Sequence, residues 1–361
     1  MEMYMSLISI SRRVVEHAGN VTNQIKGLAL ILSTVMLSVS LQAAPTDDID
    51  QKDPKAWVHL MQRQMNQVEL NGYFTYERNS HSASYHYIRQ IIDGKVRQRL
   101  IFMDGSEQGL LKSDGTLHCL HPNDKSFHEI RCDEIKSIFN VRQNFKDIWQ
   151  YYDSKLLADN RVAGRDVKYI QLMPKKNDRF PYVFAIDADQ GVLLKMVMTT
   201  PDGKVLEQFR YVSINFDDVS DATFNHGIEK YATSVLDVGQ NDNITPSVEH
   251  DDATVKTPLA VSVIAEFLPD GFVEQTKQKP VEYSRSRTFS DGLSTFSVFI
   301  EALNSSVGDV DEKSPRIAMV SDGTAVSARY VDTKKGIFQL TVIGELPLDT
   351  VKKISDQLLV K

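Results

Sequence analysis

Two cysteines and two nearby histidines are the residues of this chain whose types and spacing could support covalent or metal chemistry. Cys119 and His121 precede a turn-forming segment at residues 122–124, and His128 and Cys132 follow it. Two cysteines can form a disulfide, and two cysteines with two histidines can bind zinc. The single residue between Cys119 and His121 is a shorter spacing than zinc sites normally use. A disulfide, free thiols and a poorly spaced zinc site are therefore the three interpretations.

The loop length of the hairpin predicted around residues 122–124 separates these interpretations. A four-residue loop at residues 124–127 places Cys119 opposite Cys132, with Cα atoms at a distance that a disulfide can span. A tighter loop places His128 opposite Cys119 instead. The interpretation then depends on the redox compartment, because isolated cysteine pairs are usually bonded in oxidising compartments.

Other motifs for catalysis or metal binding are incomplete. The chain contains no G-x-S-x-G nucleophile elbow, no phosphate-binding glycine loop and no G-x-G-x-x-G motif. His128-Glu129 begins like a metalloprotease helix, but Cys132 stands where the second histidine belongs. Asp187-x-Asp189 resembles the start of a calcium loop, but Gly191 occupies the fifth position. The sequence therefore predicts a binding protein that is not an enzyme and needs no metal or cofactor.

Composition supports a folded, two-domain binding protein. The chain has 361 residues, of which 42% are hydrophobic and 25% charged. This composition is typical of globular proteins, and the length suits two domains. The formal net charge of -7 argues against general nucleic-acid binding, because no basic excess is available to neutralise phosphates.

The N-terminal segment has the pattern of a secretory signal peptide. Arg12, Arg13 and Lys26 precede an uncharged apolar run at residues 28–41, which ends near Ala43-Ala44. This run is shorter than the roughly 20 residues that a permanent transmembrane helix needs. We expect residues 1–44 to be removed and the mature chain to be exported to the periplasm, with an uncleaved anchor as the alternative. In that compartment the disulfide between Cys119 and Cys132 is the favoured interpretation.

Residues 45–231 have the pattern of an α+β domain. Asp53-Pro54 predicts the start of a helix that ends near residues 71–72. Asp-Gly turn signals at 93–94, 104–105 and 114–115 predict an antiparallel meander after it. A second helical pattern covers residues 138–152, and further strands are predicted at 166–173, 180–187, 192–199 and 205–214. We expect a curved antiparallel half-barrel sheet covered by helices, with a concave face that can hold an apolar ligand.

A polar, acidic linker is predicted at residues 232–257, followed by a smaller α+β domain at 258–361. The predicted strands of its antiparallel sheet are 281–289, 294–303, 317–320, 324–330 and 336–342. A closing helix is predicted to begin near Pro347, with Asp349 or Thr350 as its cap and Val351, Ile354, Leu358 and Leu359 on its apolar face.

Several stretches, in order along nearly the whole mature chain, resemble the RseB/MucB family. In the first domain these are Met103–Gly105, Tyr151–Asp153, Arg161–Arg165, Tyr182–Asp187 and Asp202–Arg210, which reads DGKVLEQFR. In the second domain they are Leu268–Phe272, Phe289–Val298 and Val342–Pro347. Each stretch alone is weakly specific, whereas the ordered set across both domains is specific.

The resemblance implies a first domain similar to the lipoprotein carriers LolA and LolB, followed by a small regulatory domain. It implies a periplasmic negative regulator of the envelope-stress sigma factor. Such a protein binds the periplasmic part of a single-pass anti-sigma factor and shields it from the site-1 protease until lipoprotein or lipopolysaccharide displaces it. A periplasmic lipoprotein or lipid carrier of the LolA/LolB type is the alternative, and the oligomeric state, including a homo-oligomer, is left open.

Two sets of residues are candidates for these contacts. Phe289, Asp291, Leu293 and Phe296, with Glu207 and Phe209, are the candidates for partner binding. The alternative is that Asp291-Gly292 is an ordinary turn and that the neighbouring aromatic residues belong to a core. Tyr182, Phe184 and Ile186 alternate along one strand, so they either line a lipid cleft or meet the covering helix.

Overall fold

The computed structural model describes residues 46, 48–78, 81–105, 108–122, 148–236, 263–275, 286–303, 317–321 and 323–361. Residues Ala43–Lys361 form one compact unit. The described residues of this unit form a 12-stranded sheet, a six-stranded sheet and a two-stranded ribbon, and all of their strand pairs are antiparallel. Among the described residues, no helix is long and apolar enough to span a membrane.

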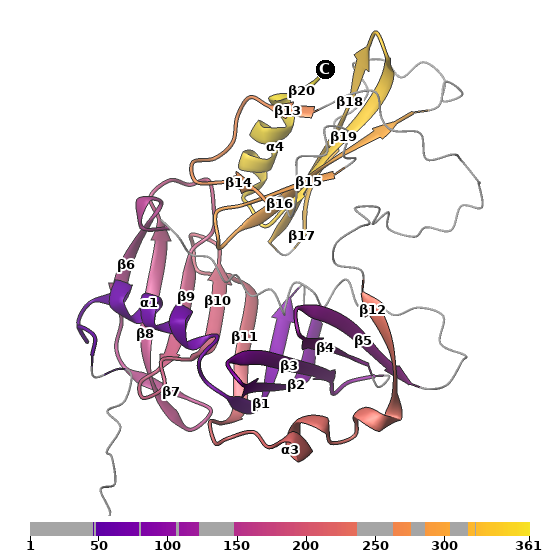
Figure 1. Cartoon of the computed structure of the whole chain (residues 1–361). Helices are drawn as coiled ribbons and strands as arrows, with labels where there is room; N and C mark the ends of the chain where they lie inside the picture. The colour runs from indigo at the N-terminus through magenta and orange to yellow at the C-terminus, as the bar shows by residue number, and fades with distance from the viewer. Residues whose placement is uncertain are drawn as a thin grey trace, which may run out of the picture. The chain divides into compact units, whose positions relative to one another are not determined.

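The large sheet has the order β12-β5-β4-β3-β2-β1-β11-β10-β9-β8-β6, with β7 paired to β8 (Figure 1). Its strands are β1 (Leu70–Arg78), β2 (His81–Ile92), β3 (Lys95–Phe102), β4 (Gly109–Ser113), β5 (Thr116–Pro122), β6 (Tyr152–Leu156), β7 (Asn160–Val162), β8 (Arg165–Pro174), β9 (Tyr182–Asp187), β10 (Leu193–Thr199), β11 (Val205–Asn215) and β12 (Tyr231–Leu236).

Asp-Gly turns join β2 to β3 and β4 to β5 at two of the three predicted positions, whereas Asp104-Gly105 lies in the longer connection between β3 and β4. Asp93 and Gly94 both have positive φ, at 50° and 73°, and Asp114 and Gly115 have φ of 51° and 78°. Two consecutive left-handed residues match the right-handed twist of the strands that they join. These turns confirm the antiparallel meander.

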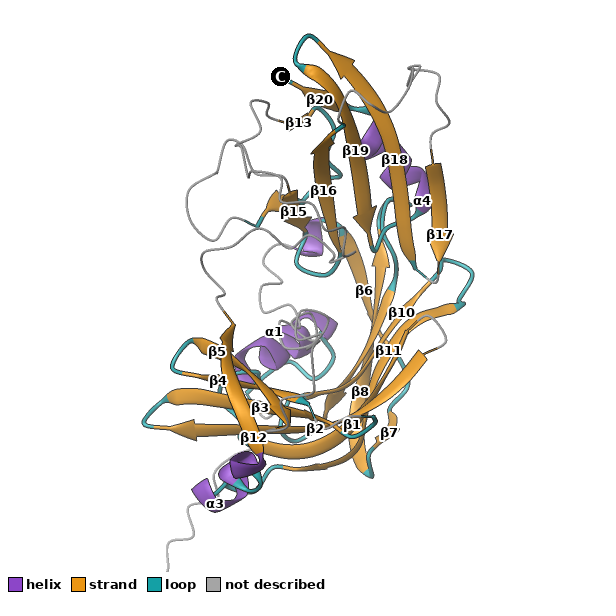
Figure 2. Ribbon diagram, turned by 90° about the vertical axis from the view of Figure 1, so that its right-hand side faces the viewer, coloured by secondary structure: helices purple, strands orange, loops and turns teal. Residues whose placement is uncertain are grey.

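Helix α1 (Pro54–Gln64) lies inside the curve of the large sheet, as Figure 2 shows. The Asp53 side chain caps it by accepting a hydrogen bond from the Lys55 backbone N–H at 2.9 Å. Its fully buried Trp57 and Leu60 join the hydrophobic cluster formed by β6, β8, β9 and β10. The helix therefore covers one half of the inner face.

Two helix predictions were wrong in extent. The first helix ends at Gln64 rather than near residues 71–72, because the chain turns at residues 65–67 and Leu70 enters β1. In the second helical pattern, Ile148–Gln150 is the short 3-10 helix η1, and Tyr152 begins β6 by pairing with Pro174. Residues 138–147 of that pattern lie outside the described residues.

The small sheet has the order β14-β15-β16-β19-β18-β17, and strands β13 and β20 form the separate ribbon. Their bounds are β13 (Val263–Ala265), β14 (Val273–Glu274), β15 (Ser286–Ser290), β16 (Thr295–Ala302), β17 (Ile317–Ser321), β18 (Thr324–Thr333), β19 (Gly336–Gly344) and β20 (Leu358–Val360). Helix α4 (Leu348–Asp356) packs on this sheet through buried Val351 and Ile354.

Three boundary expectations need correction, two in the small domain and one at the predicted linker. The N-cap of α4 is Pro347 rather than Asp349 or Thr350. Leu358 and Leu359 do not extend the helix, because they pair with β13 in β20. Strand β12 pairs with β5 and takes residues 232–236 of the predicted linker into the large sheet.

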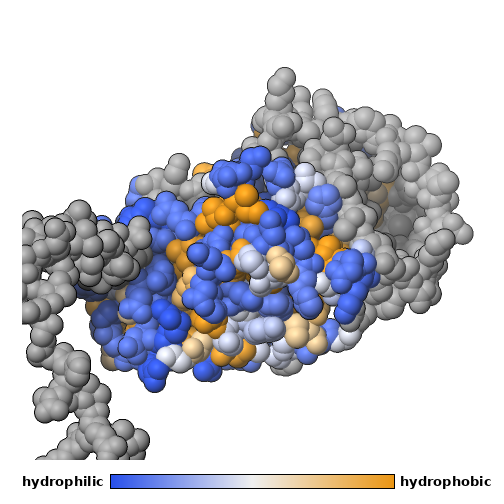
Figure 3. Space-filling model, turned by 60° about the horizontal axis from the view of Figure 1, so that its bottom comes forward, coloured by the Kyte–Doolittle hydropathy of each residue, from blue (hydrophilic) through white to orange (hydrophobic). Residues whose placement is uncertain are grey.

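The outer face of the large sheet carries helix α3 (Asp221–Asn225), whose buried Phe224 packs with Ile88 and Val219. The short 3-10 helix η2 (Ile228–Lys230) follows it. On the face turned forward in Figure 3, hydrophobic patches alternate with hydrophilic side chains. Such a mixture is ordinary for a solvated protein surface. The architecture confirms the expected α+β class with a curved, open antiparallel sheet covered by helices.

Candidate functional site

Arg179, between β8 and β9, is the centre of a buried contact between the two sheets. Its side chain is 2% exposed. Its Nη1 donates to Oδ2 of Asp291 at 2.7 Å, and its Nη2 donates to the carbonyl oxygen of Asp270 at 2.8 Å. Its Nε and Nη2 also donate to the two carboxylate oxygens of Asp178, at 2.8 and 3.1 Å. The Arg179 guanidinium therefore binds Asp178, beside it in the chain, and two segments of the C-terminal domain, at Asp270 and Asp291.

Aromatic rings surround the same guanidinium. Its central carbon lies 5.2 Å from the ring centroid of Tyr151, 5.8 Å from that of Tyr152 and 5.1 Å from that of Phe272. An arginine within about 6 Å of an aromatic centroid is attracted by the ring quadrupole, most strongly where water is excluded. The rings thus add to the hydrogen bonds that hold Arg179.

Asp291 organises the turn that meets Arg179. Its Oδ1 accepts hydrogen bonds from the backbone N–H groups of Leu293 and Ser294, at 2.8 and 2.7 Å. Gly292 has a φ of 96°, which only glycine adopts readily. The other oxygen, Oδ2, faces Arg179 and the Tyr152 hydroxyl, which donates at 3.3 Å. The Asp291 carboxylate therefore both closes its own turn and binds the large sheet.

Leu293, at the tip of this turn, is fully buried in the hydrophobic cluster of the large sheet. The Tyr182 hydroxyl lies 3.3 Å from both the Leu293 carbonyl oxygen and the Ser294 Oγ. Leu293, from the turn between β15 and β16 of the small sheet, is thus part of the hydrophobic core of the large sheet.

Burial and charge shift the pKa values of two residues here. Burial alone would lower the pKa of Arg179, but the hydrogen bonds to Asp178 and the charge of Asp291 outweigh it and raise the pKa. Burial, followed by the nearby Asp291 carboxylate, raises the pKa of Tyr152 well above its ordinary value. Arg179 therefore stays charged and Tyr152 stays protonated at physiological pH.

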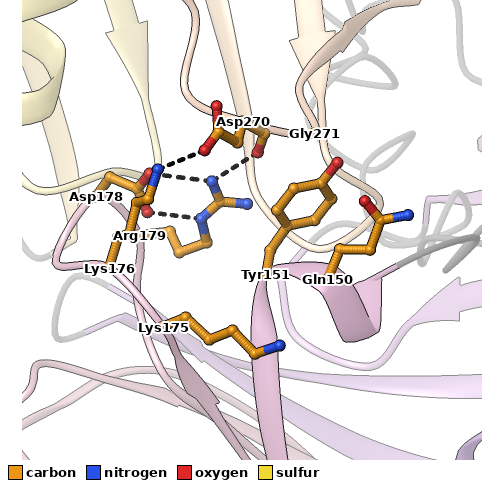
Figure 4. Close-up of a pocket in the computed structure, with 8 residues that line it drawn as sticks. All are labelled: Gln150, Tyr151, Lys175, Lys176, Asp178, Arg179, Asp270 and Gly271. Carbon is orange, nitrogen blue, oxygen red and sulfur yellow. Dashed lines mark hydrogen bonds and ion pairs between the residues drawn. The ribbon is translucent and has the colours of Figure 1, made fainter.

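A cavity of about 350 Å³ opens beside this contact (Figure 4). Its walls are mostly polar: Gln150, Tyr151, Lys175, Lys176, Asp178, Arg179, Asp270 and Gly271. Lys176 and Asp270 form an ion pair across it. Gly271, with a φ of 85°, packs so closely that a Cβ atom would lie 2.2 Å from the Tyr151 ring. The loop at 268–272 is therefore closely fitted to Tyr151.

A second contact lies at Arg78, near the end of β1. Its Nη1 is 2.7 Å from a carboxylate oxygen of Glu345, and its Nη2 donates to the Thr324 hydroxyl at 2.7 Å. Glu207, a predicted partner-binding residue, lies 3.6 Å from the same Nη1. The Arg78 and Glu345 side chains are 23% and 16% exposed, so solvent screens this pair more than the Arg179 pair.

The predicted partner-binding residues occupy different environments. Phe289 and Phe296 stack on each other at 5.0 Å in the core of the small sheet. Asp291 and Leu293 reach the large sheet, as described above. Phe209 packs against Phe74 at 4.8 Å, between clusters of the large sheet. The partner-binding role of all these residues stays a prediction.

The predicted cleft residues Tyr182, Phe184 and Ile186 are fully buried in one cluster with residues of α1. The prediction that they alternate along one strand is confirmed by β9, whose other face carries Ala185 and Asp187. They meet the covering helix, as one of the two interpretations expected. Their contact with a lipid stays a prediction.

Cys119 is buried on β5, between Leu110 of β4 and Ser234 of β12. The predicted hairpin that would pair β5 with the following residues is wrong, because both edges of β5 are taken by β4 and β12. Cys119 is disulfide-bonded. The chain has one other cysteine, Cys132, which lies outside the described residues, as do His128 and Glu129. The Cys119–Cys132 pairing therefore stays a prediction.

The incomplete calcium motif has a structural use. The Asp187 carboxylate accepts from the backbone N–H groups of Asp189 and Gln190, at 3.0 and 2.7 Å, and pairs with Arg165. Among the described residues, no group of three or more potential metal ligands is present.

Arg179 and Arg78 lie outside every motif that the sequence offers, and Tyr152 stands out only as part of the family-like stretch Tyr151–Asp153. Arg179 follows an aspartate in a polar loop, where a charged residue is normally solvated. No local pattern distinguishes it, because its partners Asp270 and Asp291 lie far away along the chain.

Family models and relatives agree along the chain. The model of the MucB/RseB N-terminal domain matches residues 53–234, and that of the MucB/RseB C-terminal domain matches residues 263–359. The sigma factor AlgU regulatory protein MucB of Pseudomonas aeruginosa is 28% identical over 339 residues, covering 91% of this chain and 95% of that protein. The sigma-E factor regulatory protein RseB of Haemophilus influenzae is 28% identical over 330 residues, covering 90% and 96%.

Solved structures share the fold. A crystal structure of MucB in complex with MucA(peri) has a TM-score of 0.64 at 24% identity, covering 85% of this chain and 98% of that chain. A crystal structure of MucB alone has a TM-score of 0.56 at the same identity, covering 85% and 97%.

Proposed function

Because the chain belongs to the MucB/RseB family, we propose that it is a negative regulator of an envelope-stress sigma factor. In this role it binds the periplasmic part of a single-pass anti-sigma factor. It shields that segment from the site-1 protease until lipoprotein or lipopolysaccharide displaces it. The signal-peptide pattern at residues 1–44 supports a periplasmic location.

The ordered match to both family models carries this proposal. A pure carrier needs an apolar sheet that holds a ligand, whereas this chain also has a second sheet and a buried polar contact between the two. The matched relatives are named as sigma-factor regulators, and MucB has been solved bound to MucA(peri). These names support a binding role for this chain with an anti-sigma factor as its partner.

A ligand can release the partner only if it binds the partner-free state more tightly than the bound state. The two sheets and their shared contact offer a physical basis for such a difference, because a rearrangement at the contact changes both regions together.

The test is a pull-down of the mature chain, residues 45–361, with the periplasmic segment of the anti-sigma factor from the same organism. We expect binding that a lipoprotein or lipopolysaccharide reduces, and protection of that segment from the site-1 protease. Absence of binding by a chain that still takes up acylated protein would instead favour a lipoprotein carrier.

A further inference from the structure

We infer that the turn at residues 290–294, together with Arg179, is a latch that opens as one unit and controls access to the apolar site occupied by Leu293. This latch is a property of the fold and does not rest on the proposed function.

The polar part of the latch is the Arg179–Asp291 ion pair, and both of its side chains are buried. The Arg179 and Asp291 side chains are 2% and 0% exposed, and 2.7 Å separates their paired atoms. A charge left without its partner in such surroundings is strongly unfavourable. The pair therefore favours either a fully formed contact or a fully separated one in which water reaches both groups.

Its apolar part is carried by the same turn. Asp291 fixes the backbone of Leu293 and Ser294 through its Oδ1. Movement of the carboxylate away from Arg179 therefore moves Leu293 as well, and removes it from the cluster that contains Tyr182. The polar and apolar contacts are thus coupled through one short, hydrogen-bonded turn.

The remaining contacts around the latch are weaker or depend on it. The Arg78–Glu345 pair is more exposed, at 23% and 16%, so solvent screens it more than the Arg179–Asp291 pair. The loop at 268–272 is held partly by Arg179, through the Asp270 carbonyl oxygen and the Phe272 ring. The cavity beside Arg179 gives water a route to the contact once it loosens. The Arg179–Asp291 pair therefore controls whether the contact between the two sheets is closed or open.

The experiment measures the distance between spin labels on cysteines introduced at two exposed positions, Ala158 near the large sheet and Lys334 in the small sheet. The wild-type mature chain is expected to show one narrow distance distribution. Asp291→Asn keeps the Oδ1 acceptor of the turn and removes the charge. Arg179→Met removes the guanidinium. Each variant is expected to add a second, broader population, with the open-to-closed ratio increased by about two to three orders of magnitude for Arg179→Met.

Two further variants make the outcome specific. Arg179→Met combined with Asp291→Asn removes both charges of the buried pair and leaves only the partly exposed Asp178 carboxylate without its partner, so this double variant is expected to open less than Arg179→Met alone. Arg165→Met breaks the pair with buried Asp187 inside the large sheet, and is expected to leave the distance distribution unchanged. Binding of a hydrophobic fluorescent dye is expected to increase with the open population, because the Leu293 site becomes accessible.

One narrow distribution in both folded single variants, with unchanged dye binding, would overturn the latch. Equal broadening in Arg165→Met would do so as well, since it would show general loosening. If Arg179→Met does not fold, Asp291→Asn and the milder Tyr152→Phe, which removes the hydroxyl that binds Asp291 and Ser294, carry the same test.

Discussion

Arg89 of β2 holds the end of helix α1, and its removal should release that helix from the large sheet. The side chain is 4% exposed. Its Nε donates to the Val68 carbonyl oxygen at 2.6 Å, and its two terminal nitrogens donate to the carbonyl oxygens of Met65 and Gln64. The last carbonyls of a helix have no partner within it, and Arg89 donates to that of Met65, whereas the Gln64 carbonyl oxygen also accepts from the backbone N–H groups of Gln67 and Val68 at 3.2 and 3.3 Å.

The expected effect of Arg89→Met follows from these bonds. A hydrogen bond from a charged donor contributes about 1.5–3 kcal/mol. The bonds to Met65 and Val68 are short, whereas the one to Gln64 is 3.4 Å long and contributes little. Because water can reach part of the freed carbonyls, we expect the local free energy of opening of α1 to fall by about 2–4 kcal/mol.

Native-state hydrogen exchange measures this quantity directly. A loss of about 2–4 kcal/mol corresponds to α1 amides that exchange about 30 to 1,000 times faster than in the wild type. Arg63→Met is the matched control, because it removes the same charge from an exposed position in the last turn of the same helix. It is expected to change the opening free energy by less than about 1 kcal/mol. Exchange of α1 in Arg89→Met within threefold of the wild type would refute the assigned role of Arg89.

Three further predictions concern other contacts. Gly271→Ala places a Cβ atom against the Tyr151 ring and strains the backbone, so the unfolding free energy measured with denaturant is expected to fall by at least about 1–2 kcal/mol. Burial lowers the pKa of His86 to about 4, so the folded state binds fewer protons than the unfolded state between about pH 4 and pH 6.5. Stability is therefore expected to fall by about 1–2 kcal/mol as the pH drops through that window, and His86→Phe is expected to remove this loss in denaturation at several pH values. Reduction of the predicted Cys119–Cys132 disulfide is expected to lower the unfolding free energy by about 2–4 kcal/mol, and thiol titration of the unreduced, denatured chain is expected to find no free thiol.

Each of these predictions has a clear contrary result. Gly105 also has a positive φ but has no atom within 4 Å of its missing Cβ. An equal loss of unfolding free energy in Gly105→Ala would therefore show that backbone strain alone, and not the contact with Tyr151, explains the effect of Gly271→Ala. For His86, whose pKa is also lowered by the nearby charge of Arg99, an unchanged pH dependence in His86→Phe would contradict the assignment. Two reactive thiols in the unreduced chain would disprove the disulfide.

The sequence by itself determined the elements that local chemistry controls. Paired left-handed residues at Asp93-Gly94 and Asp114-Gly115 are required by tight hairpins, so the dipeptides predicted the meander. Asp53 followed by Pro54 predicted the start of α1, because a side-chain acceptor and a fixed φ suit the first helical turn. The period-2 pattern of Tyr182, Phe184 and Ile186 predicted β9, since alternation follows from strand geometry.

Tertiary structure decided where these elements end and what joins the sheets. Helix α1 ends at Gln64. There Arg89 of β2, a residue distant in the chain, donates hydrogen bonds to the carbonyl oxygens of Gln64 and Met65. Leu358 leaves the helical pattern because β13 is available to pair with it. Arg179 is buried although it follows four polar residues, 175–178, because Asp291 neutralises its charge from the turn of another sheet. Local sequence carries no record of such partners, since the energy that favours them arises only after the chain has brought the segments together.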